Sequence, residues 1–221
     1  MTTPACPLRR LLGATAILSL VALTGVQSVQ AGQQQYEPLS ASVQASLQGA
    51  VSDRAPRQPI FASRALRDHW LSEMGRQLAK RIPDERYRHD LLLSVHYEAT
   101  RAGLDPQLVL GLIQVESNFR KYAVSSAGAR GYMQIMPFWS KLLAQSEDNL
   151  FHLRTNLRYG CTILRHYLDI EKGDLFRALG RYNGSLGKSD YPNKVHAAWQ
   201  RWAYQPPPEL ITAANLSEAR R

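Results

Sequence analysis

The sequence has very little cysteine, since only Cys6 and Cys161 occur among 221 residues. Cys6 belongs to an N-terminal stretch that has the features of a removable export signal, described below. Without that stretch Cys161 has no partner within the chain, so no intrachain disulfide can form. Cys161 shares helical spacing with Leu157 and Leu164, and we expect it to pack in a core.

Residues that hold metals or phosphates are also sparse. His89 and His96 are seven residues apart, and no other histidine or cysteine lies at ligand spacing, so the sequence predicts no metal site. No glycine-rich phosphate loop occurs, and we expect no cofactor.

Acidic residues are fewer than basic ones, 18 against 27, which gives a formal net charge of +9. Such a balance favours an anionic partner, such as a membrane surface, a nucleic acid or a bacterial cell wall. The basic residues form no run of five or more and are not interleaved with aromatic residues. We therefore expect no nucleic-acid partner.

The first 31 residues have the pattern of a cleaved signal peptide. Arg9 and Arg10 precede the apolar run Leu11–Val26, and Val29–Ala31 supplies small residues at a cleavage site. The run is shorter than about 18 residues and is interrupted by Gly, Ser and Thr, so it is a poor membrane span. We expect an exported protein with no stable membrane anchor after cleavage.

Long alternating strands are absent, and helical signals dominate the rest of the chain. Residues 32–62 are rich in Gln, Ser, Ala and Pro and predict a flexible leader, with a weak helix near 42–51. Residues 63–204 predict one mainly α domain, and 205–221 predict an exposed tail that starts with three prolines. The expected helices lie within 63–82, 83–103, 105–119, 156–173, 174–183 and 189–202.

Glu116 is the one acidic residue in the stretch from Gly111 to Pro137, and it shares an apolar helical stripe with Leu112 and Ile113. Burial and the negative end of the helix both disfavour its charged form. If Arg120 points to solvent, we expect the Glu116 pKa to rise toward neutrality, which suits a general acid. The alternative is a Glu116 that faces water at a frayed helix end.

Uncharged hydrogen-bonding residues recur in the apolar or glycine-rich segments that follow. They are Ser117, Ser125, Gln134, Tyr182 and Asn183. Such groups suit a neutral, hydroxyl-rich substrate such as a sugar.

Three segments, "ESNF", "GARGYMQIMP" and "RYNGS", resemble in order and spacing the signature motifs of the soluble lytic transglycosylase (SLT) family. The resemblance covers roughly 91–202. It implies a fold like that of goose-type lysozyme, a helical domain with a substrate cleft. It also implies cleavage of peptidoglycan glycan strands without a cofactor, and the export signal places this expected activity in the periplasm.

Carried over by motif, Glu116 is the catalytic acid and base of the resembled family. Ser125, Gln134 and Met136 match residues that line the cleft, while Tyr182 and Asn183 match the pair that steadies the carboxyl and the sugar. Ser117 follows the acid, and we expect it either to bind substrate or to cap the helix end.

The sequence departs from the family pattern at three positions. Tyr132 replaces the usual Leu, Arg181 the usual Ala and Ser185 the second Gly. These changes affect the walls and charge of the expected cleft and leave substrate preference open.

Ordinary glycoside hydrolysis uses two carboxylates. None lies between Glu116 and Glu147, and the later acids look exposed or capping, although Asp190 can fold back. This favours intramolecular attack that closes a 1,6-anhydro ring. A hydrolytic muramidase, or a non-catalytic peptidoglycan-binding module for a secretion or conjugation apparatus, remains the alternative, and envelope partners stay unidentified.

Overall fold

The computed structural model describes residues 1–2, 34–52, 61–143 and 148–218. Apart from its first two residues, the predicted signal peptide lies outside these ranges. The described part of the chain is helical, with isolated antiparallel bridges in place of a sheet. Its helices are α1 (Ala41–Val51), α2 (Arg64–Leu78), α3 (Glu85–Arg101), α4 (Pro106–Ser117), α5 (Pro137–Leu143), α6 (Leu153–Ile170), α7 (Leu175–Asn183), α8 (Asp190–Arg201) and α9 (Pro208–Glu218). The mainly α fold class is thus confirmed.

Side-chain caps define where several helices begin. Ser63 caps α2, Asp84 caps α3 and Asp174 caps α7, each accepting a hydrogen bond from a backbone N–H of the first turn. Asp105 caps α4 by accepting from Gln107 N, and Pro106 occupies the first helical position.

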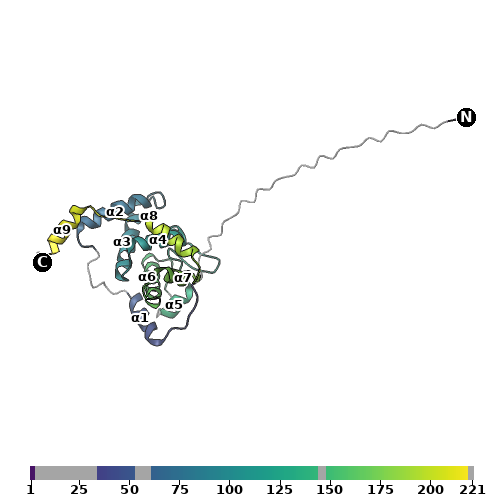
Figure 1. The fold of residues 1–221 in the computed structure, drawn as a ribbon, viewed down its shortest axis with the longest axis horizontal. Coiled ribbons are helices and arrows are strands. Elements are labelled where there is room, and N and C mark those ends of the chain that lie inside the picture. Colours follow the sequence, from purple (N-terminus) through teal and green to yellow (C-terminus); the bar gives the residue numbers. More distant parts are fainter. Residues whose placement is uncertain (3–33, 53–60, 144–147, 219–221) are drawn as a thin grey trace.

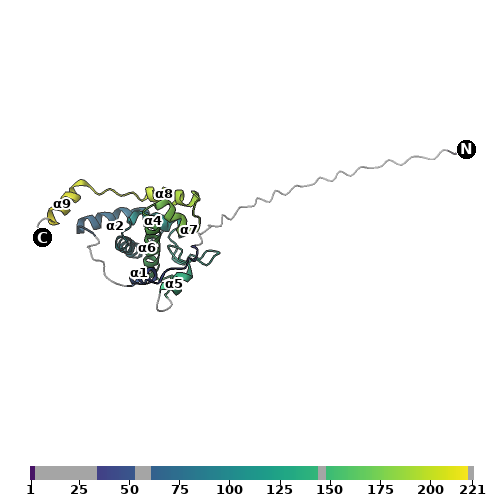
Figure 2. The ribbon, with the colours of Figure 1, turned by 60° about the horizontal axis from the view of Figure 1, so that its bottom comes forward.

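Helix α6 lies in the middle of the domain and packs against α1, α3 and α7 (Figures 1 and 2). Its buried face includes Leu157, Ile163 and Leu164. Cys161 is buried on the same helix and is a free thiol, so the predicted core position is confirmed.

Helices α4 and α8 pack closely against each other, far apart though they are in sequence. Gly111 makes this approach possible, because a Cβ built there would lie 2.7 Å from the backbone nitrogen of Trp199. Trp202, at the end of α8, is buried and donates from its indole nitrogen to Gln114 Oε1 at 2.9 Å. This pairing brings the C-terminal turn of α4 beside the first turn of α8.

In place of the flexible leader expected over 32–62, the structure has residues 34–52 packed against the domain. Helix α1 contacts α5 and α6, and Leu47 is buried in the core. Leu39 and Val43 are partly buried against the same core. Because the segment has so few large apolar side chains, the sequence alone gives little indication that it packs on the domain. The side chains that cover them come from helices distant in sequence.

Two further helices were not foreseen. Helix α5 starts at Pro137 directly after the glycine-rich loop and buries Trp139 and Leu143. In the expected tail, Pro208 begins α9 instead of preventing a helix, because proline fits the first turn. Helix α9 packs against α2 and buries Ala214, so part of the tail is covered.

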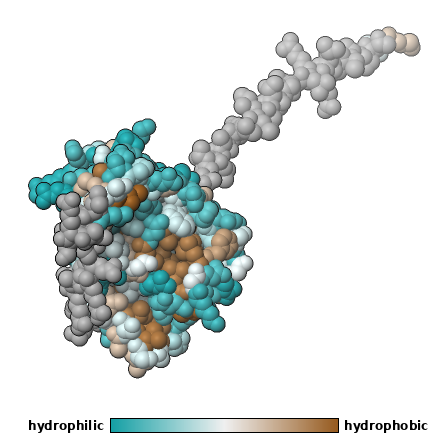
Figure 3. Space-filling view, turned by 60° about the vertical axis from the view of Figure 1, so that its left-hand side comes forward, coloured by the Kyte–Doolittle hydropathy of each residue, from teal (hydrophilic) through white to brown (hydrophobic). Residues whose placement is uncertain are grey.

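The surface is mainly hydrophilic but not uniform. On the face in Figure 3, apolar residues gather in one area that hydrophilic residues surround. Within the described ranges, no helix combines the length and apolar character needed to cross a bilayer.

We expect Gly111→Ala to lower the free energy of unfolding by about 1–3 kcal/mol, because the new methyl group meets backbone atoms of α8. Gly49→Ala is the matched control, since a Cβ at Gly49 meets nothing within 4 Å. That control should be neutral or raise stability by up to about 1 kcal/mol. Urea unfolding of both variants measures the difference, and equal midpoints would contradict the proposed close packing.

Candidate active site

Glu116 lies in the last turn of α4 and is only 4% exposed. Tyr191, from the first turn of α8, donates its hydroxyl hydrogen to Glu116 Oε1. The α4–α8 pairing therefore brings a phenol and a carboxyl together inside an apolar environment. The alternative of a water-facing Glu116 at a frayed helix end does not hold in this structure.

Burial raises the pKa of Glu116 from its ordinary value of 4.5 to about 8. The hydrogen bond from Tyr191 acts in the opposite direction, because it stabilises the carboxylate. Arg120 is exposed and donates from Nε to the Ser117 carbonyl at 3.1 Å. Glu116 is thus mostly protonated at pH 7, as the sequence predicted for an Arg120 that points to solvent.

Two other carboxylates of the described chain, the buried Glu98 and the half-buried Glu171, are neutralised by arginines. Glu98 accepts from Arg101 at 3.2 Å and from Arg158 at 3.3 Å. Glu171 pairs with Arg177 and Arg181. Glu116 differs because its described side-chain hydrogen bond comes from a neutral phenol.

Within the described part of the chain, no second carboxylate contributes to the pKa shift of Glu116. The effects that shift its pKa are burial and the Tyr191 hydrogen bond. Asp190, the acid that sequence reasoning left open, is exposed at the start of α8. Likewise, the described ranges contain no cluster of three or more His, Cys, Asp or Glu suited to a metal.

Ser117 is 1% exposed and both of its side-chain contacts are structural. Its hydroxyl donates to the Tyr132 carbonyl at 2.8 Å and lies 3.2 Å from the Ile113 carbonyl. Of the two roles considered for Ser117, the geometry therefore favours positioning: it ties the end of α4 to the loop that follows.

That loop, residues 118–136, folds back on itself beside the end of α4. Gln134 adopts a left-handed backbone conformation, with φ 49°, and its side-chain amide donates to the carbonyls of Ala123 and Gly131. Ser125 is half-buried, and its hydroxyl accepts from Ala129 N at 3.0 Å. The Gln134 side chain thus closes the loop from within.

Asn156, on α6, was missed by sequence reasoning although it organises the same loop. It is fully buried, accepts from Met133 N at 2.8 Å, and donates to the carbonyls of Arg130 and Leu150. Gly131 must lack a side chain here, because a Cβ would lie 2.4 Å from Asn156 Nδ2. Asn156 could have been identified as a polar residue among the apolar residues of one helix face. The same kind of signal identified Glu116 on α4.

Tyr182 and Asn183, at the end of α7, lie close to this loop. The buried Tyr182 donates to the Met133 carbonyl at 2.8 Å, and its pKa is raised by burial first and then by Glu116. The hydroxyl that bonds the Glu116 carboxyl is that of Tyr191, not Tyr182, and no sequence motif pointed to it. Asn183 donates to Ser185 Oγ at 2.9 Å, while its Oδ1 is buried and accepts no hydrogen bond from the described residues.

We predict that Glu116→Gln stabilises the fold increasingly as the pH rises from about 4.5 to about 8. In this window the folded wild type holds a proton that the unfolded chain has released, so wild-type stability falls by up to about 1.4 kcal/mol per pH unit. Glutamine carries no such proton. Urea unfolding at several pH values measures the gap, which should level off above about pH 8.

Glu209→Gln serves as the control, since it removes an exposed carboxylate from α9. A gap between wild type and Glu116→Gln that stays constant with pH would show that Glu116 is ionised throughout this window.

Comparison with known proteins agrees with the motifs. A family model described as the transglycosylase SLT domain matches residues 94–204, half of the chain. A transglycosylase of Enterobacteria phage PRD1 is 36% identical over 99 residues, which cover 42% of this chain and 36% of the relative.

Shorter matches involve proteins named membrane-bound lytic murein transglycosylase C. The protein from Actinobacillus pleuropneumoniae serotype 5b (strain L20) is 54% identical over 39 residues, 18% of this chain and 11% of the relative. The protein from Mannheimia succiniciproducens is 46% identical over 43 residues, 20% of this chain and 12% of the relative. The chain thus spans about a third or less of the length of these relatives. The match of the SLT model to half the chain, together with the helical fold, shows that this chain belongs to the transglycosylase SLT domain family.

Proposed function

We propose that the chain is a lytic transglycosylase that cleaves peptidoglycan between N-acetylmuramic acid and N-acetylglucosamine, leaving 1,6-anhydro ends. The observation that carries the proposal is Glu116, a buried carboxyl with a pKa of about 8 and no second carboxylate acting on it within the described residues. Family membership and the names of the relatives support the same reaction class.

In the first step, protonated Glu116 donates its proton to the glycosidic oxygen, and the bond between that oxygen and the anomeric carbon breaks. Positive charge develops at the anomeric carbon while Glu116 becomes a carboxylate. The Tyr191 hydroxyl is already hydrogen-bonded to this carboxyl and stabilises the charge that appears on it.

In the second step, the Glu116 carboxylate takes the proton from the C6 hydroxyl of the muramoyl residue. The C6 oxygen attacks the anomeric carbon and closes the 1,6-anhydro ring, so Glu116 ends protonated and no water is consumed. A single group serves both steps because its pKa lies near neutral pH. The absence of a second carboxylate effect on Glu116 within the described chain supports this route over hydrolysis.

Neighbouring polar groups suit a sugar substrate. The buried Asn183 Oδ1, which accepts no described hydrogen bond, fits a sugar hydroxyl donor. Ser125 stays half-buried on the loop, and the predicted roles of Ser125 and Met136 as substrate contacts are part of the proposal. The pattern of residues 1–31 supports export, and we assign the reaction to the periplasm.

We expect Glu116→Gln to lower the release of fragments from purified peptidoglycan by at least about 100-fold, since it removes the proton donor. Mass spectrometry of the wild-type digest should show anhydromuramoyl ends. Glu209→Gln, which removes an exposed carboxylate from α9, should digest like the wild type.

Reducing ends in the wild-type digest would favour a hydrolytic muramidase instead. If the wild type binds peptidoglycan but releases no fragments, the chain is a wall-binding module and the proposed activity is wrong.

A further inference from the structure

The segment of residues 34–52 is here called the strap. It runs from the candidate active site to Arg158, in the N-terminal half of α6. It consists of the extended residues 34–40 followed by α1. In Figures 1 and 2 it lies along the same side of the domain as α5. Its contacts with α5, α6 and α7 show that it is docked on the domain.

Gln34, at the start of the strap, is 3% exposed and contacts the predicted substrate site. Its Oε1 accepts from Met136 N at 3.2 Å, and its Nε2 lies 3.4 Å from the Gln134 carbonyl as a donor. One side chain of the strap thus hydrogen-bonds backbone groups of two predicted site residues.

These contacts match the chemistry of the proposed substrate. The carboxamide of Gln34 uses a carbonyl acceptor and an N–H donor here, and the acetamido group of an N-acetylated sugar carries the same two kinds of group. The N–H of Met136 and the carbonyl of Gln134 cannot serve both groups at once. An acetamido group that reaches this pair must therefore displace Gln34.

An ion pair next to Gln34 holds the strap in place. Glu37 lies 3.0 Å from Arg181 on α7, and Arg181 is itself fixed by Glu171. Tyr36 adds an edge-to-face contact with Phe138 on α5, with ring centroids 5.7 Å apart. Arg181 is a position at which this chain departs from the family pattern, so the anchor belongs to this chain rather than to the motif.

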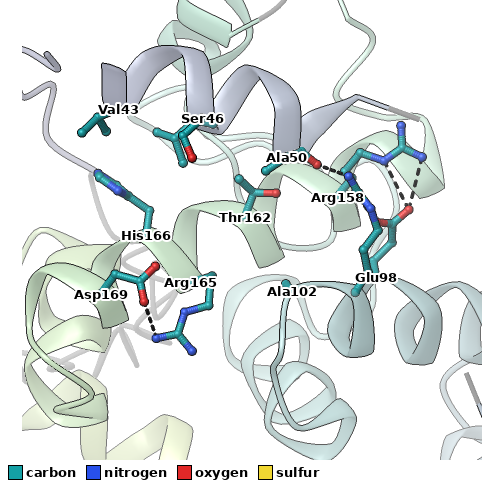
Figure 4. A pocket seen from close by; sticks show the side chains of 12 residues that line it. Val43, Ser46, Ala50, Glu98, Ala102, Arg158, Thr162, Arg165, His166 and Asp169 are labelled. Carbon is teal, nitrogen blue, oxygen red and sulfur yellow. Dashed lines mark hydrogen bonds and ion pairs between the residues drawn. The ribbon is translucent and has the colours of Figure 1, made fainter. Parts of the chain in front are cut away.

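The other end of the strap is held by arginines. Arg101 donates to the carbonyls of Ala50 and Ser52, and Arg158 donates to the Val51 carbonyl at 3.4 Å. Both cations face the C-terminal end of α1, where the helix dipole favours positive charge. Figure 4 shows Ala50 directed toward this cluster, with Arg158 in turn bonded to Glu98.

Packing beneath α1 is incomplete. A cavity of about 420 Å³ lies between α1 and helices α3 and α6, lined by Val43, Ser46, Glu98 and Thr162 among others (Figure 4). Leu47 is the one buried residue of α1. A helix that packs partly over a cavity costs less to detach than one packed on a filled core.

We propose that the strap is an autoinhibitory element: Gln34 occupies part of the glycan site, and glycan must displace it to bind. This inference rests on the proposed function, because it names the competitor as an N-acetylated glycan. Turnover then depends on how firmly Glu37 and α1 hold the strap.

The first test measures kcat/KM on purified peptidoglycan with the N-terminal region intact. Gln34→Ala and Glu37→Lys should each raise kcat/KM about 2- to 10-fold, the range that follows from losing one or two hydrogen bonds or an ion pair. Gln48→Ala, an exposed glutamine of α1, and Glu209→Lys, the same charge change on α9, should match the wild type. Unchanged or lower kcat/KM in both strap variants, with unfolding midpoints like the wild type, overturns the proposal.

The second test does not depend on turnover. Amide hydrogen exchange over residues 35–51 is followed in Glu116→Gln while chitotetraose, an N-acetylated glycan, is added. Faster exchange on binding supports displacement of the strap, as does binding that appears only when Gln34→Ala is added. Unchanged exchange at saturation, or no binding in either background, overturns it. If no variant cleaves peptidoglycan, the proposed function fails, and the exchange result still decides the role of the strap.

Discussion

Burial of one carboxyl group between α4 and α8 is the constraint on which the site depends. Gly111 lets the two helix backbones approach, and this approach sets Tyr191 against Glu116. Desolvation raises the pKa of Glu116 because it disfavours the carboxylate. The hydrogen bond from the Tyr191 phenol limits this rise because it stabilises the carboxylate. A group balanced in this way can give up a proton and take one back near neutral pH, which is what a single acid and base requires.

A small set of buried hydrogen bonds fixes the position of the loop after α4 relative to the Glu116 carboxyl. Ser117 bonds the Tyr132 carbonyl, Asn156 bonds three backbone groups of or next to the loop, and Gln134 closes the loop from within. Because each of these side chains is buried and already bonded, they fix geometry rather than contact solvent. Asn183 differs from these residues, because its buried Oδ1 accepts no hydrogen bond from the described residues.

Local signals in the sequence were sufficient for much of the fold and for the central residue. The caps at Asp105 and Asp174 and the apolar stripe around Glu116 act within one helix, so the sequence alone predicts them. Tyr191 and the docking of α1 were not predictable, because each depends on which distant helices meet. The family resemblance identified Tyr182 as the partner of the carboxyl, yet Tyr182 bonds Met133, and only the three-dimensional arrangement reveals Tyr191 in that place.

The central claim is that burial keeps Glu116 protonated at neutral pH. The most direct measurement is a ¹³C NMR titration of the glutamate side-chain carboxyls in the folded protein, with the Glu116 signal assigned by its absence in Glu116→Gln. The structure predicts a titration midpoint of about 8 for that signal. A midpoint near the ordinary value of 4.5 would contradict the account.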